Sequence, residues 1–114
     1  MSIIYDETRR LFKLDTSDSS YVIGVWDEDY LLGLYYGAKI EDMHFDGFKR
    51  RFTGFSVQNP VLGSDGFSPD TAPMEYGCNG AGDHRIAALS VRNAEGNTTT
   101  DVRYVTHRIY AGKP

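Results

Sequence analysis

The sequence predicts an all-β fold: an antiparallel β-sandwich with a long irregular loop in the middle and little or no helix. Aromatic side chains make up 13% of the 114 residues, and they occur with many β-branched residues. Both kinds are typical of strands, because they pack well on a pleated surface. Short apolar runs alternate with polar turns, and no segment has the caps and apolar spacing of an amphipathic helix. This length suits one domain, residues 1–114.

Four short strands are expected in the first third of the chain, at residues 3–5, 11–14, 21–26 and 30–36. Asp and Ser residues at 15–19 favour a turn, because their side chains bond the nearby backbone. Three acidic or polar residues at 27–29 separate the third and fourth runs. These two runs therefore predict a β-hairpin.

Residues 37–84 have a different pattern, in which Gly, Pro, Asp and Ser recur every few positions. We predict an irregular loop here, and a loop of this length in a compact domain is usually functional or covers a partner. Strands are expected again at residues 85–92 and 98–110, joined by a turn at 93–97 that contains Gly96.

Composition and charge argue against several classes of partner and cellular location. The formal net charge is −4, so nothing favours nucleic acid or an anionic membrane as a partner. Cys78 is the only cysteine, which excludes an internal disulfide. The first residues do not have the pattern of a signal peptide, and no apolar run is long enough to cross a membrane. We therefore expect a cytoplasmic protein.

No motif for metal binding or nucleophilic catalysis is present. His44, His84 and His107 lie far apart in the sequence and have no ligand at metal-binding spacing, so we expect no metal and no cofactor. Glycosidases use two acids that flank the scissile bond. No spacing selects such a pair among the acids of the middle segment, which are Asp65, Asp70, Glu75 and Asp83.

Several of these polar and aromatic residues have more than one interpretation. Asp83 is suited to a structural ion pair with Arg85, or to bonding backbone amides of the glycine-rich bend. Flat aromatic rings on loops bind the apolar face of sugars, but the same rings also fill cores and interdomain surfaces. Both interpretations stay open for Trp26, Tyr35, Tyr36 and Tyr76.

Four stretches together carry a family resemblance. They are residues 3–6 (IIYD), 30–37 (YLLGLYYG), 73–89 (PMEYGCNGAGDHRIAAL) and 99–114 (TTDVRYVTHRIYAGKP). In this order and spacing they resemble the start of the melibiase-type α-galactosidases of glycoside hydrolase family 36.

The resemblance implies a non-catalytic piece of a larger enzyme. Members of that family have an N-terminal β-supersandwich, a (β/α)₈ barrel that carries two catalytic aspartates, and a C-terminal β domain. They are retaining enzymes that remove terminal α-galactose from melibiose, raffinose and related oligosaccharides. The chain is then the truncated N-terminal β-sandwich domain, without the barrel and without catalytic residues, and hydrolysis belongs to the parent protein.

The resemblance also implies partners and a site. Its members are commonly homotetramers in which the N-terminal domain packs on the barrel, and loops of this domain help to shape the active-site entrance of another subunit. The matching loop, residues 51–76, supplies the substrate-binding candidates Phe55, Asn59, Asp65 and Tyr76. The expected partners are the chain's own barrel domain and further copies. An autonomous carbohydrate-binding module of sandwich type is the alternative.

Overall fold

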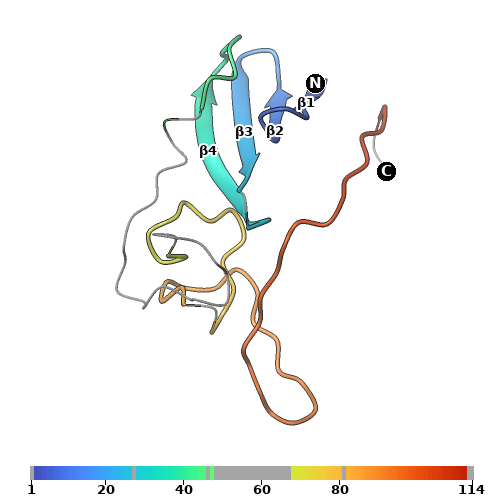
Figure 1. Cartoon of the computed structure of the whole chain (residues 1–114). Helices are drawn as coiled ribbons and strands as arrows, with labels where there is room; N and C mark the ends of the chain where they lie inside the picture. The colour runs from blue at the N-terminus through green and yellow to red at the C-terminus, as the bar shows by residue number, and fades with distance from the viewer. Residues whose placement is uncertain (1, 27, 46, 48–67, 81, 113–114) are drawn as a thin grey trace.

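The structure, a computed structural model, describes residues 2–26, 28–45, 47, 68–80 and 82–112. Its strands are β1 (Ser2–Asp6), β2 (Leu11–Asp15), β3 (Ser19–Val25) and β4 (Leu31–Ala38). They pair antiparallel in the order β1-β2-β3-β4 and form one meander (Figure 1). The all-β prediction is confirmed, and the first four strands lie where the sequence predicted them. No helix in the described part is long and apolar enough to cross a membrane.

The turns between these strands are built from polar side chains, as the sequence predicted. Between β1 and β2, the Asp6 carboxylate accepts a hydrogen bond from the Arg9 backbone N–H at 2.9 Å and pairs with its guanidinium at 2.8 Å. Between β2 and β3, the Thr16 hydroxyl accepts a bond from the Ser19 N–H at 3.0 Å. These side chains satisfy backbone groups that the sheet leaves without partners.

One face of the sheet carries the apolar core. Leu11, Val22 and Leu32 are fully buried there. The register shifts between β3 and β4, so that Val22 lies opposite Tyr35 and Ile23 lies opposite Gly33. The extra residue lets two neighbouring side chains of β4 contact the same core. The rest of the core cluster is Trp26, Tyr30, Leu34, Phe45 and Ala72.

A buried polar network lies at one end of this core face. The Lys13 ammonium is 3.0 Å from the Asp15 carboxylate, and these side chains are only 6% and 8% exposed. The Ser20 hydroxyl donates to Asp15 at 2.6 Å and accepts from the Ile40 backbone N–H at 3.0 Å. The bond from Ser20 is the main cause that lowers the pKa of Asp15. Each charge on this face is therefore paired, as burial requires.

The second face of the sheet is apolar as well, because the pleat sends alternate residues to opposite sides. It carries Ile3, Phe12, Leu14, Ile23 and Leu31. The last described part of the chain, dark orange to red in Figure 1, runs past this face as one extended segment. We call residues 101–110 the strap.

The strands predicted at 85–92 and 98–110 are wrong for the described structure. These residues form no ladder; the bridge that the structure describes among them joins Leu89 to Cys78. A strand needs a neighbouring backbone along its length. The described chain offers these segments only isolated backbone bonds, such as those from Ala88 N–H to the Gly77 carbonyl and from Thr100 N–H to the Asn79 carbonyl. The turn predicted between them is present, with a bond from Asn93 N–H to the Asn97 carbonyl at 3.0 Å and Gly96 at φ 83°.

Candidate functional site

Three of the four predicted site residues, Phe55, Asn59 and Asp65, lie outside the described residues. Tyr76 is described, and 44% of its surface is exposed. The adjoining segment, residues 68–85, therefore defines how this part of the candidate site is held.

Residues 73–75 add a short strand-like edge to the sheet. The Gly33 N–H donates to the Pro73 carbonyl at 2.8 Å, and the Glu75 N–H donates to the Leu31 carbonyl at 2.8 Å. Leu32 and Met74 form the antiparallel bridge between these bonds. Tyr76 follows directly after this edge, so the sheet fixes the position of its backbone.

The carboxylate of Glu75 lies back over β4. A Cβ atom on Gly33 would be 2.6 Å from Glu75 Oε2, so the glycine is what makes room for this side chain. Burial and, after it, the Glu75 carboxylate raise the pKa of Tyr21 to about 12. The phenol therefore stays protonated at neutral pH.

Arg85 ties the two ends of the segment together. Its guanidinium donates to the carbonyls of Pro69 at 2.8 Å and Ala72 at 2.7 Å, and it binds both oxygens of Asp83 at 2.8 Å. The predicted ion pair of Asp83 and Arg85 is thus confirmed. The bond from Arg85 is the main cause that lowers the pKa of Asp83, whose side chain is 6% exposed. A forked donor suits this role, because it reaches several acceptors at once.

A tight bend then joins the segment to the C-terminal part. Gly80 has φ 87°, a region that favours glycine, and a Cβ there would be 3.0 Å from the Thr99 Cα. The Thr100 N–H donates to the Asn79 carbonyl at 2.8 Å across this contact. Only a residue without a side chain allows the two backbones to come this close.

The chemistry of this segment is structural. Two of its described acids are bonded to nearby side chains, Asp70 to Ser68 and Asp83 to Arg85, and the carboxylate of Glu75 lies over Gly33. Within the described residues, no three His, Cys, Asp or Glu side chains gather as a metal site would require. The segment is a fixed support that presents Tyr76.

The other candidate aromatics divide between core and surface. Trp26 is 2% exposed and belongs to the core cluster, and Tyr35 packs against that cluster. These two rings therefore have the core-filling role. Tyr36 is 79% exposed, which leaves Tyr36 and Tyr76 as the accessible rings of the four.

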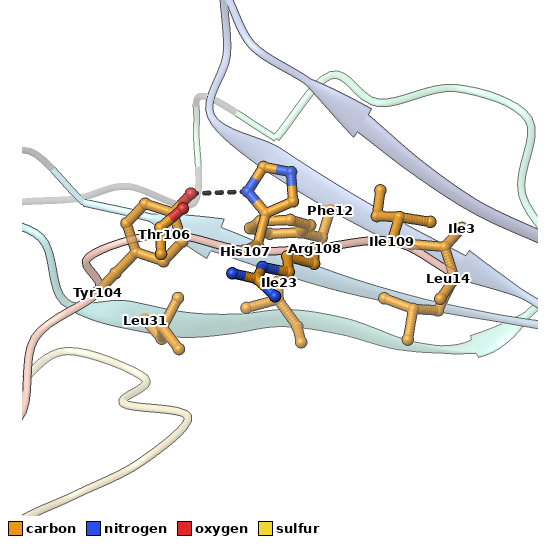
Figure 2. Close-up of a pocket in the computed structure, with 10 residues that line it drawn as sticks. All are labelled: Ile3, Phe12, Leu14, Ile23, Leu31, Tyr104, Thr106, His107, Arg108 and Ile109. Carbon is orange, nitrogen blue, oxygen red and sulfur yellow. Dashed lines mark hydrogen bonds between the residues drawn. The ribbon is translucent and has the colours of Figure 1, made fainter. Parts of the chain in front are cut away.

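An apolar groove lies between the second face of the sheet and the strap (Figure 2). Its volume is about 320 Å³. Ile3, Phe12, Leu14, Ile23 and Leu31 form the sheet side. The strap side is formed by Tyr104, Thr106, His107, Arg108 and Ile109.

Polar contacts hold the beginning of the strap to the turn between β3 and β4. Arg103 donates to the Glu28 carbonyl at 3.0 Å, and its guanidinium lies 4.7 Å from the centre of the Tyr30 ring. The Tyr30 hydroxyl donates to Asp101 at 2.8 Å, and Arg103 pairs with Asp101 at 2.8 Å. Burial is the main cause that raises the pKa of Tyr30, followed by its bond to Asp101.

Sequence reasoning missed this clamp. Asp101 and Arg103 are two residues apart, a spacing that places both side chains on one side of an extended chain. That spacing was the only feature of the local sequence that pointed to a contact between these two side chains. Their partner Tyr30 lies 71 positions away from Asp101, so only the fold reveals the contact.

Comparison with known proteins identifies relatives of the whole chain. Residues 29–114 match the glycosyl hydrolase family 36 N-terminal domain. The α-galactosidase AgaA of Geobacillus stearothermophilus is 38% identical over 115 residues, which cover 100% of this chain and 16% of that protein. The bifunctional α-galactosidase/sucrose kinase AgaSK of Mediterraneibacter gnavus is 34% identical, over 99% of this chain and 12% of that protein.

Solved structures agree with these matches. The crystal structure of the family 36 α-galactosidase AgaB from Geobacillus stearothermophilus superposes with a TM-score of 0.84 at 37% identity. It covers 100% of this chain and 15% of the AgaB chain. A variant of AgaA in complex with raffinose gives a TM-score of 0.80 at 36% identity, over 91% of this chain and 14% of that chain. The present chain thus spans about a sixth of the length of the relative AgaA.

Proposed function

Because the chain belongs to the N-terminal domain family of glycosyl hydrolase family 36, we propose that it is the non-catalytic N-terminal region of an α-galactosidase. Its role is to pack on a catalytic barrel domain and to help shape the entrance of an active site for terminal α-galactosides. The enzymatic activity belongs to the complete protein, and a cytoplasmic location remains part of the prediction.

One observation carries the packing role. The sheet is apolar on both faces, and the strap leaves an open groove of about 320 Å³ over the second face. An open apolar groove of this kind is a surface on which another domain or subunit can pack. Beyond the turn at residues 93–97, Val102 and Val105 also expose 39% and 87% of their surface. A barrel domain that packs here would remove this apolar area from water.

A domain exchange in a relative tests the proposal. The matching N-terminal segment of AgaA would be replaced by this chain, and the product compared with AgaA that lacks the segment. We expect the chimera to hydrolyse a chromogenic α-galactoside, the deletion variant to be inactive or insoluble, and the isolated chain to be inactive. Hydrolysis by the isolated chain would contradict the non-catalytic role. A chimera no better than the deletion variant would contradict the packing role.

The second part of the proposal is self-association. Isolated from a barrel domain, the chain would cover its apolar second face and unpaired strand edges with a further copy. We therefore expect a dimer or a strand-exchanged oligomer in light scattering at high concentration. A monomer at all concentrations would contradict this part of the proposal.

An autonomous carbohydrate-binding module is the alternative, favoured by the exposed ring of Tyr76 on its fixed support. Titration of the isolated chain with galactose, melibiose or raffinose, followed by calorimetry, separates the two. Specific heat of binding would favour the module. Its absence, together with an active chimera, would favour the N-terminal region of an enzyme in which Phe55, Asn59, Asp65 and Tyr76 meet substrate only in the assembled protein.

A further inference from the structure

The strap is held very differently along its two halves. In residues 101–104, which we call the anchor, the Tyr104 N–H donates to the Asp29 carbonyl at 2.7 Å. The Asp29 carboxylate is in turn fixed by the Arg10 guanidinium at 2.5 Å. With the clamp of Asp101, Arg103 and Tyr30, the anchor is bonded through both backbone and side chains.

Residues 105–110, which we call the arm, are held by far fewer bonds to the described part of the chain. Among the described residues, no backbone group of the arm is hydrogen-bonded to another backbone group. Val105 is 87% exposed, and Tyr110 is 57% exposed. An extended chain without backbone bonds stays in place only through its side chains, so the arm depends on the few that reach the sheet.

His107 is the main side-chain contact of the arm. Its ring lies 4.3 Å from the ring of Tyr5 and 4.7 Å from that of Phe12, centre to centre. Its Nδ1 is 2.7 Å from the Tyr104 hydroxyl, a bond that joins the arm to the anchor and is drawn in Figure 2. Ile109 contributes to the groove but remains 46% exposed.

We propose that the strap is a hinged element, with a fixed anchor at residues 101–104 and an arm at 105–110 that is pinned over the apolar groove by His107. Release of the pin frees the arm and opens the second face of the sheet, while the anchor keeps the arm beside the groove. The device goes beyond the packing role, because it assigns separate tasks to the two halves of one segment.

Backbone ¹⁵N relaxation of the full chain tests the hinge. Rigid amides have order parameters of about 0.85, and flexible ones lie below about 0.6. In His107→Ala we expect the arm to fall below about 0.6 while the anchor stays near about 0.85. Tyr104→Phe keeps the ring and removes only the hydroxyl, so we expect a smaller loss of order in the arm. Val105→Ala is the matched control, and we expect it to leave both halves as in the wild type.

The anchor is tested by Arg103→Ala, which we expect to loosen residues 101–110 together. Amides of β2 and β3 that are protected from hydrogen exchange report whether the sheet is still folded in each variant. Should Arg103→Ala lose that protection, Arg103→Lys replaces it, because Lys keeps the charge and loses the fork that reaches Asp101 and Glu28. An arm that is equally ordered in His107→Ala and wild type would overturn the pin. An anchor that loosens along with the arm in His107→Ala, or one that stays rigid when Arg103 is changed, would overturn the hinge.

Discussion

The core of the first face should depend strongly on Leu32. This side chain is fully buried in β4, opposite Gly24 of β3, and Met74 lies across the bridge on its other side. Leu32→Ala removes three carbon atoms, which is about 2.4 kcal/mol of transfer free energy at ~0.8 kcal/mol per buried methylene. The cavity that remains adds to this, so we expect the free energy of unfolding to fall by about 3 kcal/mol.

Urea denaturation followed by fluorescence measures this loss. Trp26 is the only tryptophan and is 2% exposed in the same core, so its emission reports on the unfolding of the face that Leu32 supports. A slope of roughly 1.5 kcal/mol per molar urea converts the loss to a midpoint about 2 M lower. A domain of this size has a total free energy of unfolding of roughly 6–17 kcal/mol, so the variant should still fold.

The matched control deletes the same number of carbons from the surface. Ile86 is fully exposed, and we expect Ile86→Ala to change the unfolding free energy by less than about 0.5 kcal/mol. If Leu32→Ala lowers the free energy of unfolding by less than about 1 kcal/mol, with the same dependence on urea concentration, the assignment of this core is wrong. Equal costs for the two variants would show that Ile86 is buried in solution, against the burial described above.

Three further predictions concern the candidate site. Asp83→Asn should lower the free energy of unfolding by about 1–2 kcal/mol at neutral pH, because Arg85 loses a charged partner at a partly exposed site. Since the pKa of Asp83 is depressed, its contribution is present above the ordinary value of 3.8 and is lost as the pH falls through the lower folded value. Acid denaturation curves of the variant should therefore be flatter than those of the wild type, and parallel curves would refute the ion pair as a source of stability. Gly80→Ala should lower the unfolding free energy by at least about 1 kcal/mol more than Gly112→Ala, as measured by urea denaturation. The two glycines have φ of 87° and 88°, but only the first would place a Cβ against Thr99, so equal losses would argue against that close contact. In the AgaA chimera, Tyr76→Ala should raise KM for raffinose about twofold to twelvefold at an unchanged kcat, by the loss of one sugar-stacking ring of ~0.5–1.5 kcal/mol. Tyr36→Ala serves as the exposed aromatic control, and an unchanged KM in Tyr76→Ala would remove this ring from the entrance.

The first four strands and their turns were predictable because their signals are local. The alternation of apolar side chains and the polar residues at 15–19 act over a few positions, and the described structure follows them closely. The ion pair of Asp83 and Arg85 was predictable for the same reason, since two positions separate the partners.

The segments at 85–92 and 98–110 show the limit of this reasoning. Their composition favours strands, yet the described backbone beside them makes only isolated bonds and no ladder. Strand propensity states how well a residue fits a sheet and does not supply the sheet. The register shift at Val22 and Ile23, which brings Leu34 and Tyr35 to one core, also has no sequence signal that separates it from regular alternation.

What the sequence alone determined is thus the strand-forming first third, its turns, the all-β class and the family resemblance that the comparisons confirmed. Only the tertiary structure decided that Trp26 fills the core while Tyr76 stays accessible, and that Arg103 clamps the strap to Tyr30. The physical reason is the distance along the chain over which each interaction acts. Turns and alternation depend on neighbours in the chain, whereas burial and the clamp depend on which distant segments the completed fold brings within a few ångströms.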